Sequence, residues 1–220
     1  MTHPNPSRRR VAAALVAAPC LTALPRLAGA QPAGGAPVDT KDYARLANPQ
    51  PQATPGKVEV LEFFSYACPH CASFEPTLND WSKRLPSDLV LRRVPVPFLA
   101  AAEMLQRTYF ALEATGKLET VHPRIFNALH VEKQRPTTPD DMAQIVAKSG
   151  GDAAAFLAAY KSFGVAGSVA KAKKLTGDYN VQSVPTLAVG GRFVTSPSQA
   201  GSSDRALAVV EALAKQSPKG

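Results

Sequence analysis

The chain lacks a hydrophobic run long enough to cross a membrane. Its apolar stretch from Val11 to Leu24 is shorter than the roughly 20 residues that a transmembrane helix needs, and a proline interrupts it. Arginines at positions 8–10 precede this stretch, and the small residues Ala28-Gly29-Ala30 follow it. This order predicts a removable signal peptide over residues 1–30 and a mature chain that begins near Gln31, with a retained anchor as the alternative. The paired arginines favour twin-arginine export, and the ordinary secretory route stays open.

The chain also lacks a long basic run. Lys and Arg number 25 and Asp and Glu 17, which gives a formal charge of +8. Residues 1–30 hold four arginines and no acid, so the rest of the chain carries +4. Lys171, Lys173 and Lys174 cluster with the spacing of a solvated helix face. We therefore expect no nucleic-acid partner.

Cysteine is scarce, and its placement is informative. Of three cysteines, Cys20 falls in the predicted signal peptide, which leaves Cys68 and Cys71. A zinc site usually needs about four ligands, and the remaining histidines (His70, His122 and His130) complete none, so we expect no metal. An exported Cys-x-x-Cys pair instead indicates redox chemistry, because exported thiols meet oxidants.

The segments around the cysteines have strand and helix patterns. Lys57 to Ser65 is apolar on both faces, which is typical of a central strand covered on both sides. Pro69 to Arg84 has helical spacing, with a proline suited to the first turn and Pro76 predicting a kink. A second strand is expected over Leu89 to Phe98.

The middle of the chain predicts a helical subdomain over residues 99–164. Four segments with helical spacing are separated by Gly, Pro and Ser: Ala101–Thr115, Leu118–His130, Pro139–Ser149 and Asp152–Ser162.

The two ends of the mature chain have simpler patterns. A helix over Val165–Leu175 should be followed by a hairpin around Gly190-Gly191 and a closing amphipathic helix over Asp204–Lys215, capped by Ser203. The Pro- and Gly-rich residues 31–56 predict an extended lead-in with one helical turn near residues 43–46.

The order strand, Cys-x-x-Cys, helix favours a reactive thiol. The N-terminus of a helix stabilises negative charge, so Cys68 should ionise below its usual pKa and act as nucleophile and leaving group. Cys71, one turn further on, would attack a mixed disulfide. Pro69 and His70 lie between the two cysteines, where the imidazole of His70 can stabilise the Cys68 thiolate. A structural disulfide is the alternative.

The residues Phe63-Phe64-Ser65-Tyr66-Ala67-Cys68-Pro69-His70-Cys71 closely resemble the active-site segment of the DsbA-type periplasmic thiol:disulfide oxidoreductases. The resemblance implies an α/β thioredoxin fold with an inserted helical subdomain. The thioredoxin domain would comprise residues 31–98, which include the lead-in, and 165–220, on either side of the insertion. The Cys68–Cys71 pair would be its redox-active disulfide.

Val184-Pro185-Thr186 resembles the cis-proline loop that faces the cysteines in this superfamily. The resemblance implies a cis bond at Pro185, which would expose the backbone of Val184 to a substrate chain. An ordinary trans turn proline is the alternative.

Glu62 lies in an apolar strand, where a charge is costly to bury without a partner. The family has an acid here that exchanges protons with the second cysteine. Arg92 or Arg93 could pair with Glu62, where the resemblance leads us to expect Lys. A buried carboxylate without a catalytic role is the alternative.

These features predict a periplasmic dithiol oxidase that donates the Cys68–Cys71 disulfide to reduced exported proteins through a mixed disulfide on Cys68. The resemblance implies a monomer without cofactor, recharged by a DsbB-like quinone-linked membrane oxidant. An isomerase or reductase of the same superfamily is one alternative, and a non-enzymatic peptide-binding chaperone is another.

Overall fold

A computed structural model describes residues 36–220, and the predicted signal peptide and cleavage site lie outside them. A five-stranded sheet forms the centre of this part of the chain. The strands follow the order β1 (Ala44–Arg45), β5 (Phe193–Thr195), β4 (Thr186–Val189), β2 (Val58–Phe64) and β3 (Leu89–Pro95). Strand β2 pairs in parallel with β3 and antiparallel with β4, and β4 and β5 form the predicted hairpin.

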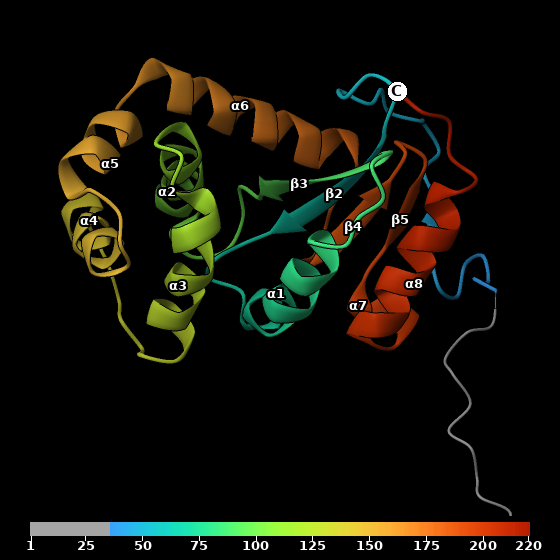
Figure 1. Cartoon of the computed structure of the whole chain (residues 1–220), viewed down its shortest axis with the longest axis horizontal. Coiled ribbons are helices and arrows are strands. Elements are labelled where there is room, and N and C mark those ends of the chain that lie inside the picture. The colour runs from blue at the N-terminus through green and yellow to red at the C-terminus, as the bar shows by residue number, and fades with distance from the viewer. Residues whose placement is uncertain (1–35) are drawn as a thin grey trace, which may run out of the picture. The chain divides into compact units, whose positions relative to one another are not determined.

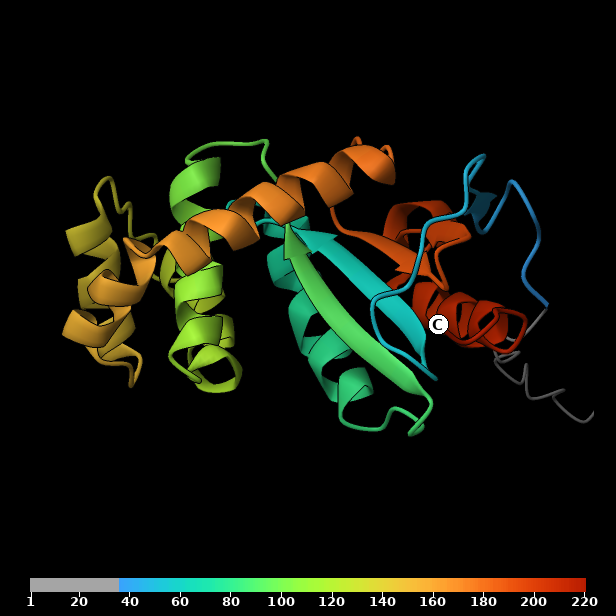
Figure 2. The same cartoon turned by 90° about the horizontal axis from the view of Figure 1, so that it is seen from above.

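Eight helices lie in the described part of the chain. They are α1 (Pro69–Ser82), α2 (Ala102–Ala114), α3 (Leu118–His130), α4 (Pro139–Lys148), α5 (Ala153–Tyr160), α6 (Phe163–Asp178), α7 (Pro197–Ala200) and α8 (Ser203–Ala214). Figures 1 and 2 show α2 to α5 grouped beside one end of the sheet. The fold is therefore the predicted α/β thioredoxin fold with a helical insertion.

Helices cover both faces of the sheet, which explains why all seven residues of β2 are buried. Val58 and Val60 pack with α1 and α8 on one face, whereas Leu61 and Phe63 pack with α6 on the other. Figure 2 shows α6 crossing above β2 and β3. Burial on both faces accounts for the continuous apolar run that predicted this strand.

Two local predictions were wrong. The region near residues 43–46 contains the short strand β1 rather than a helical turn, because Ala44 and Arg45 pair with the edge of β5. The cap of α8 is Ser202 rather than Ser203, since the Ser202 side chain accepts the backbone N–H of Arg205. The short helix α7 has no counterpart among the predicted segments.

Within residues 36–220, no single helix is both long and apolar enough to cross a membrane. Helices α5 and α6 would pass that test of length and composition as a pair, with a bend of 62° between them.

The turn between β4 and β5 requires glycine at position 191. Gly191 has a φ of +66°, and its carbonyl oxygen accepts the backbone N–H of Gln50 at 2.7 Å. An added Cβ would overlap the carbonyl oxygen of Gln50. The lead-in segment is thus held against the hairpin by a close backbone contact.

We therefore expect Gly191→Ala to lower the free energy of unfolding by more than about 1 kcal/mol, through the positive φ and the overlap. Gly167→Ala is the matched control, because Gly167 lies inside α6 with open space around its Cα. It should be neutral or stabilise by about 0.5–1 kcal/mol. Urea denaturation of both variants measures the difference, and equal effects would contradict the close contact.

Candidate active site

The junction between β2 and α1 places Cys68 at the N-cap of the helix. Its backbone is extended, with φ −88° and ψ 118°, and its Sγ accepts the backbone N–H of Cys71 at 3.4 Å. Pro69 occupies the first helical turn, where a missing N–H costs no hydrogen bond. The sulfur therefore lies at the positive end of the α1 dipole.

The surroundings of Cys68 favour its thiolate. A hydrogen bond from the Cys71 side chain is the largest effect that lowers the pKa of Cys68, which falls to about 6. The backbone N–H groups of Cys71 and His70 and the charge of His70 act in the same direction, and burial opposes them. This supports the predicted role of the helix N-terminus and places His70 beside the sulfur.

Cys71 has the opposite acidity. It is fully buried one helical turn further along, and both cysteines are free thiols in this structure. The hydrogen bond to Cys68 raises the pKa of the Cys71 thiol far above its usual range, with burial and the charge of Glu62 adding to the effect. The acidic thiol of Cys68 and the protonated thiol of Cys71 are thus neighbours.

The loop before β4 lies against Cys68, as the resemblance implies. The peptide bond between Val184 and Pro185 is cis, and the Cys68 thiol donates to the carbonyl oxygen of Val184 at 3.5 Å. Both residues line a cavity of about 510 Å³ together with His70. Thr186 is the first residue of β4, and its hydroxyl donates to the carbonyl oxygen of Ser183 at 2.8 Å. The structure therefore brings the loop and the cysteines together.

Glu62 pairs with Arg93 rather than with Arg92. The two residues are direct neighbours in the register of β2 and β3, and Arg93 Nε donates to Glu62 Oε2 at 3.1 Å. Arg92 points to the other face, where its Nε lies 3.4 Å from Glu59 Oε1. The alternation of side chains along each strand decides between the two arginines.

A second buried carboxylate shares this arginine. Arg93 also donates to Glu75 Oε1 of α1 at 3.1 Å, and both Glu62 and Glu75 are buried. Burial raises the pKa of Glu62, the charge of Arg93 opposes this, and the charge of Glu75 reinforces it. Two carboxylates and one guanidinium therefore favour a proton on Glu62.

Glu75 was not recognised in the sequence, although a signal for it exists. It lies four residues after Cys71 and three before Leu78, so the three share one face of α1, and all are buried. An acid on the buried face of a helix, one turn from a reactive cysteine, indicates a paired or functional carboxylate.

Two histidines of α3 hold the segment before Cys68, and the sequence assigned neither of them a role. His122 Nδ1 and the Tyr66 hydroxyl share a hydrogen bond of 2.7 Å, and His130 Nε2 lies 2.8 Å from the carbonyl oxygen of Tyr66. These contacts join residues 56 and 64 positions apart. No local pattern predicts such pairs.

His122 also approaches the buried carboxylates. Its Nε2 lies 3.3 Å from Glu75 Oε2, without the alignment of a hydrogen bond. Burial lowers the pKa of His122, although Glu75 opposes this effect, and burial raises the pKa of Tyr66. Burial therefore favours the neutral form of both side chains.

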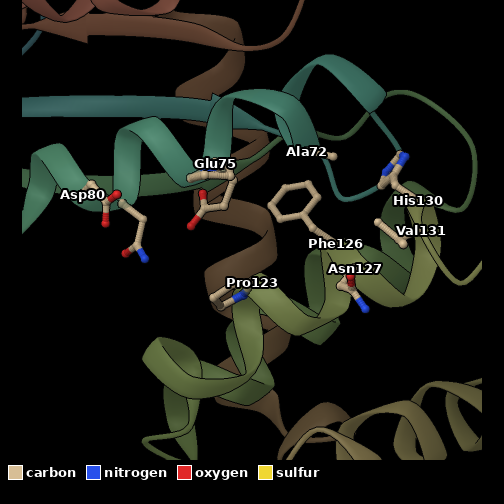
Figure 3. A pocket seen from close by; sticks show the side chains of 10 residues that line it. Ala72, Glu75, Asp80, Pro123, Phe126, Asn127, His130 and Val131 are labelled. Carbon is tan, nitrogen blue, oxygen red and sulfur yellow. The ribbon is translucent and has the colours of Figure 1, made fainter.

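A cavity of about 360 Å³ separates α1 from α3 next to these groups. Figure 3 shows Ala72 and Glu75 on α1 facing Phe126 on α3, with His130 near the loop that leads into α1. Its lining contains the acids Glu75 and Asp80 and no Lys or Arg. It shares no lining residue with the cavity beside Pro185.

Within the described part of the chain, no three His, Cys, Asp or Glu side chains are grouped as metal ligands would be. The polar groups near Cys68 and Cys71 are instead those that set thiol acidity.

Comparison with known proteins agrees with this chemistry. Residues 87–208 match the DSBA-like thioredoxin domain family. The thiol:disulfide interchange protein DsbA of Bordetella parapertussis is 41% identical over 206 residues, which cover 93% of this chain and 96% of that protein. The protein of the same name from Azotobacter vinelandii is 38% identical over 212 residues, covering 95% and 97%.

Solved structures agree as well. The crystal structure of Pseudomonas aeruginosa DsbA superposes with a TM-score of 0.78 and 37% identity, covering 81% of this chain and 93% of that one. The oxidoreductase NmDsbA1 of Neisseria meningitidis gives a TM-score of 0.73 and 30% identity, covering 81% and 93%. The chain therefore belongs to the DsbA family of thiol:disulfide oxidoreductases, with a thioredoxin fold that carries a helical insertion.

Proposed function

We propose that this protein is a periplasmic dithiol oxidase that donates a Cys68–Cys71 disulfide to reduced exported polypeptides. The observation that carries the proposal is the placement of the two thiols: Cys68 caps α1 and faces the carbonyl oxygen of Val184 before cis-Pro185, while Cys71 is buried one turn further along. The pKa of Cys68 is accordingly lowered to about 6 and that of Cys71 is raised. A sulfur with a low pKa is a good leaving group, so it passes the disulfide on readily.

The reaction proceeds through a mixed disulfide on Cys68. A substrate thiolate attacks Cys68 Sγ, the Cys68–Cys71 bond breaks, and the Cys71 sulfur leaves with the electron pair and takes up a proton. A second substrate thiolate then attacks the substrate sulfur of the mixed disulfide, and Cys68 leaves as a thiolate. Two electrons pass from the substrate to the protein, and the substrate protons are released to solvent or to Cys71.

The raised pKa of Cys71 favours completion of this reaction. A protonated thiol is a poor nucleophile, so Cys71 returns the substrate slowly and the second substrate thiol has time to attack. Glu62 would supply and recover the proton of Cys71, because its own pKa is raised by burial. The backbone beside Pro185, from Val184 to Thr186, would bind the substrate chain as a neighbouring strand does.

The proposal includes the remaining features of the family. A DsbB-like quinone-linked membrane oxidant would recharge the dithiol, the protein would act as a monomer without cofactor, and the segment 1–30 would direct export. The helical insertion would extend over residues 99–164, between the two parts of the thioredoxin domain. Membership of an enzyme family argues against the non-enzymatic chaperone.

Titration of the thiol pair against glutathione separates an oxidase from an isomerase or a reductase. An oxidising potential, near the roughly −120 mV of DsbA, supports the proposal, and a potential near the roughly −270 mV of thioredoxin would identify a reductase.

We expect Cys71→Ala to accumulate mixed disulfides on Cys68, because the nucleophile is retained and the resolving thiol is lost. Non-reducing gels of the variant mixed with a disulfide-bonded test protein measure the product. Cys68→Ala is the matched control and should form none. Trapping by Cys68→Ala instead would reverse the assignment of the two cysteines.

We expect Glu62→Gln to slow attack by Cys71 on a mixed disulfide by about tenfold or more, because the amide can neither take up nor return a proton. Stopped-flow rates of this step and of the initial attack on Cys68 provide the comparison. Glu59→Gln is the matched control, since Glu59 is equally buried on β2 and pairs with Arg92 on the opposite face. If Glu62→Gln slows both steps equally, or if Glu59→Gln slows attack by Cys71 as much as Glu62→Gln does, Glu62 has a structural role only.

We expect the reduced protein to gain stability relative to the oxidised protein as the pH rises. The folded pKa of Cys68 is about 6, below the value of about 8.5 for an unfolded thiol. The contribution is therefore complete above about pH 8.5 and is lost as the pH falls through 6. After allowance for solvent screening, the gain between about pH 5 and pH 8 should reach at most about 2 kcal/mol.

Denaturation of both redox forms across this pH range tests the linkage. A stabilised reduced form is known for DsbA, and the expectation here is that this chain shares it. Cys68→Ser is the control and should remove most of the pH dependence. A difference between the redox forms that does not change with pH would contradict the thiolate at the helix N-terminus.

A further inference from the structure

A second cavity borders Cys68 on the side of the helical insertion. We call it the insertion groove. It has a volume of about 490 Å³ and is lined by residues that include Ala67, Pro69, Met104, Leu129, Lys133 and Arg135. Ala67 and Pro69 are the sequence neighbours of Cys68, so one end of the groove lies next to the active-site segment. A polypeptide joined to Cys68 would therefore pass close to this groove.

The floor of the insertion groove is apolar. Met104 and Leu129 are half-buried hydrophobic side chains of α2 and α3 that pack against the core of the insertion. His130, at the end of α3, fixes the floor to the active-site loop through the carbonyl oxygen of Tyr66 at 2.8 Å. The groove is thus held in a constant position relative to Cys68.

The rim of the insertion groove is positively charged. Its lining contains Lys133 and Arg135 and no Asp or Glu. Neither side chain forms an ion pair within residues 36–220. Arg135 Nη1 donates to the carbonyl oxygens of Leu129 and Gln134, both at 3.1 Å, which holds the guanidinium on the rim. The lining of the cavity between α1 and α3 contains Glu75 and Asp80 and no Lys or Arg.

The backbone on both sides of the insertion groove is strained. Ala101 has a φ of +54° and Lys133 a φ of +58°, a backbone region that residues with a side chain rarely adopt. Such positions concentrate at binding sites, where the fold maintains them for the shape of the site. Here they bracket the groove from the β3–α2 loop and from the α3–α4 loop.

We propose that the insertion groove binds an acidic segment of the reduced polypeptide substrate, with an apolar side chain on the floor and carboxylates near Lys133 and Arg135. The inference rests on the proposed oxidase function and adds a substrate preference to it. The substrate cysteine lies between two cavities: the chain follows the backbone of Val184 on one side and enters the insertion groove on the other. Complementary charge raises the rate of encounter more than the final affinity, so the preference should appear in the oxidation rate.

The test uses two sets of three peptides, all with the same pair of cysteines and the same fluorescent reporter. The segment beside the first cysteine is Glu-Leu-Glu, Ser-Leu-Ser or Lys-Leu-Lys, placed before the cysteine in one set and after it in another. An excess of the oxidised protein is mixed with each peptide, and the second-order rate constant of oxidation is measured. No recycling partner is needed for this single turnover.

We expect the acidic peptide to be oxidised about five- to tenfold faster than the basic one at low salt, since each exposed ion pair contributes about 0.2–1 kcal/mol. The ratio should fall towards one in high salt. The double variant Lys133→Glu, Arg135→Glu should invert it. The matched control Lys148→Glu, Lys161→Glu changes two exposed lysines of the insertion that lie outside the lining of the insertion groove, and it should keep the ratio of the wild type.

Several results would overturn the proposal: no preference in the wild type, a ratio unchanged by the double variant, or an equal change in the control. Dimerisation of the wild type that the double variant abolishes, without any peptide preference, would instead identify the groove as a contact between copies of this chain. Failure of the oxidase function is distinguishable, because the wild type would then oxidise none of the peptides, the Ser-Leu-Ser peptide included.

Discussion

The junction between β2 and α1 is the constraint on which the rest of the site depends. Strand β2 is buried along its whole length and is held by β3 on one side and β4 on the other. Cys68, four residues after the end of β2, caps α1, which begins at the next residue. The strand therefore fixes where the sulfur meets the Cys71 thiol and the unpaired N–H groups of α1, and these hydrogen bonds lower the pKa of Cys68.

Buried charged groups near the junction between β2 and α1 add to the difference in acidity between Cys68 and Cys71. Glu62 and Glu75 share the single guanidinium of Arg93. Burial raises the pKa of Glu62 and the charge of Glu75 adds to this effect, so Glu62 is able to carry a proton. The helical insertion contributes to the same arrangement through His122, which shares a hydrogen bond with Tyr66. The insertion therefore holds the segment before Cys68 and also lines the insertion groove.

The surface around Cys68 is divided into regions of different chemistry. The lining of the cavity beside Pro185 includes His70 and several serines, and the insertion groove has apolar side chains and a basic rim. The cavity between α1 and α3 has two acids, Glu75 and Asp80, in its lining. The backbone of Val184 offers hydrogen bonds that do not depend on substrate sequence. The proposed charge preference would come from the insertion, the part of the chain that differs from a minimal thioredoxin fold.

The sequence alone determined the reactive pair and nearly all helices and strands, because each depends on local spacing: apolar runs, Cys-x-x-Cys, and Pro or Gly at element ends. The fold class came from the resemblance of the segments around Cys68 and Pro185 to the DsbA-type family. It missed β1, whose two residues form a strand only because an edge of the sheet is available. It left Arg92 and Arg93 undecided, and strand register placed Arg93 on Glu62. It gave no role to Glu75, His122 or His130, since their partners are distant in the chain. Which polar groups share a buried site is decided by tertiary packing, because only the folded chain excludes water and brings those groups within hydrogen-bonding distance.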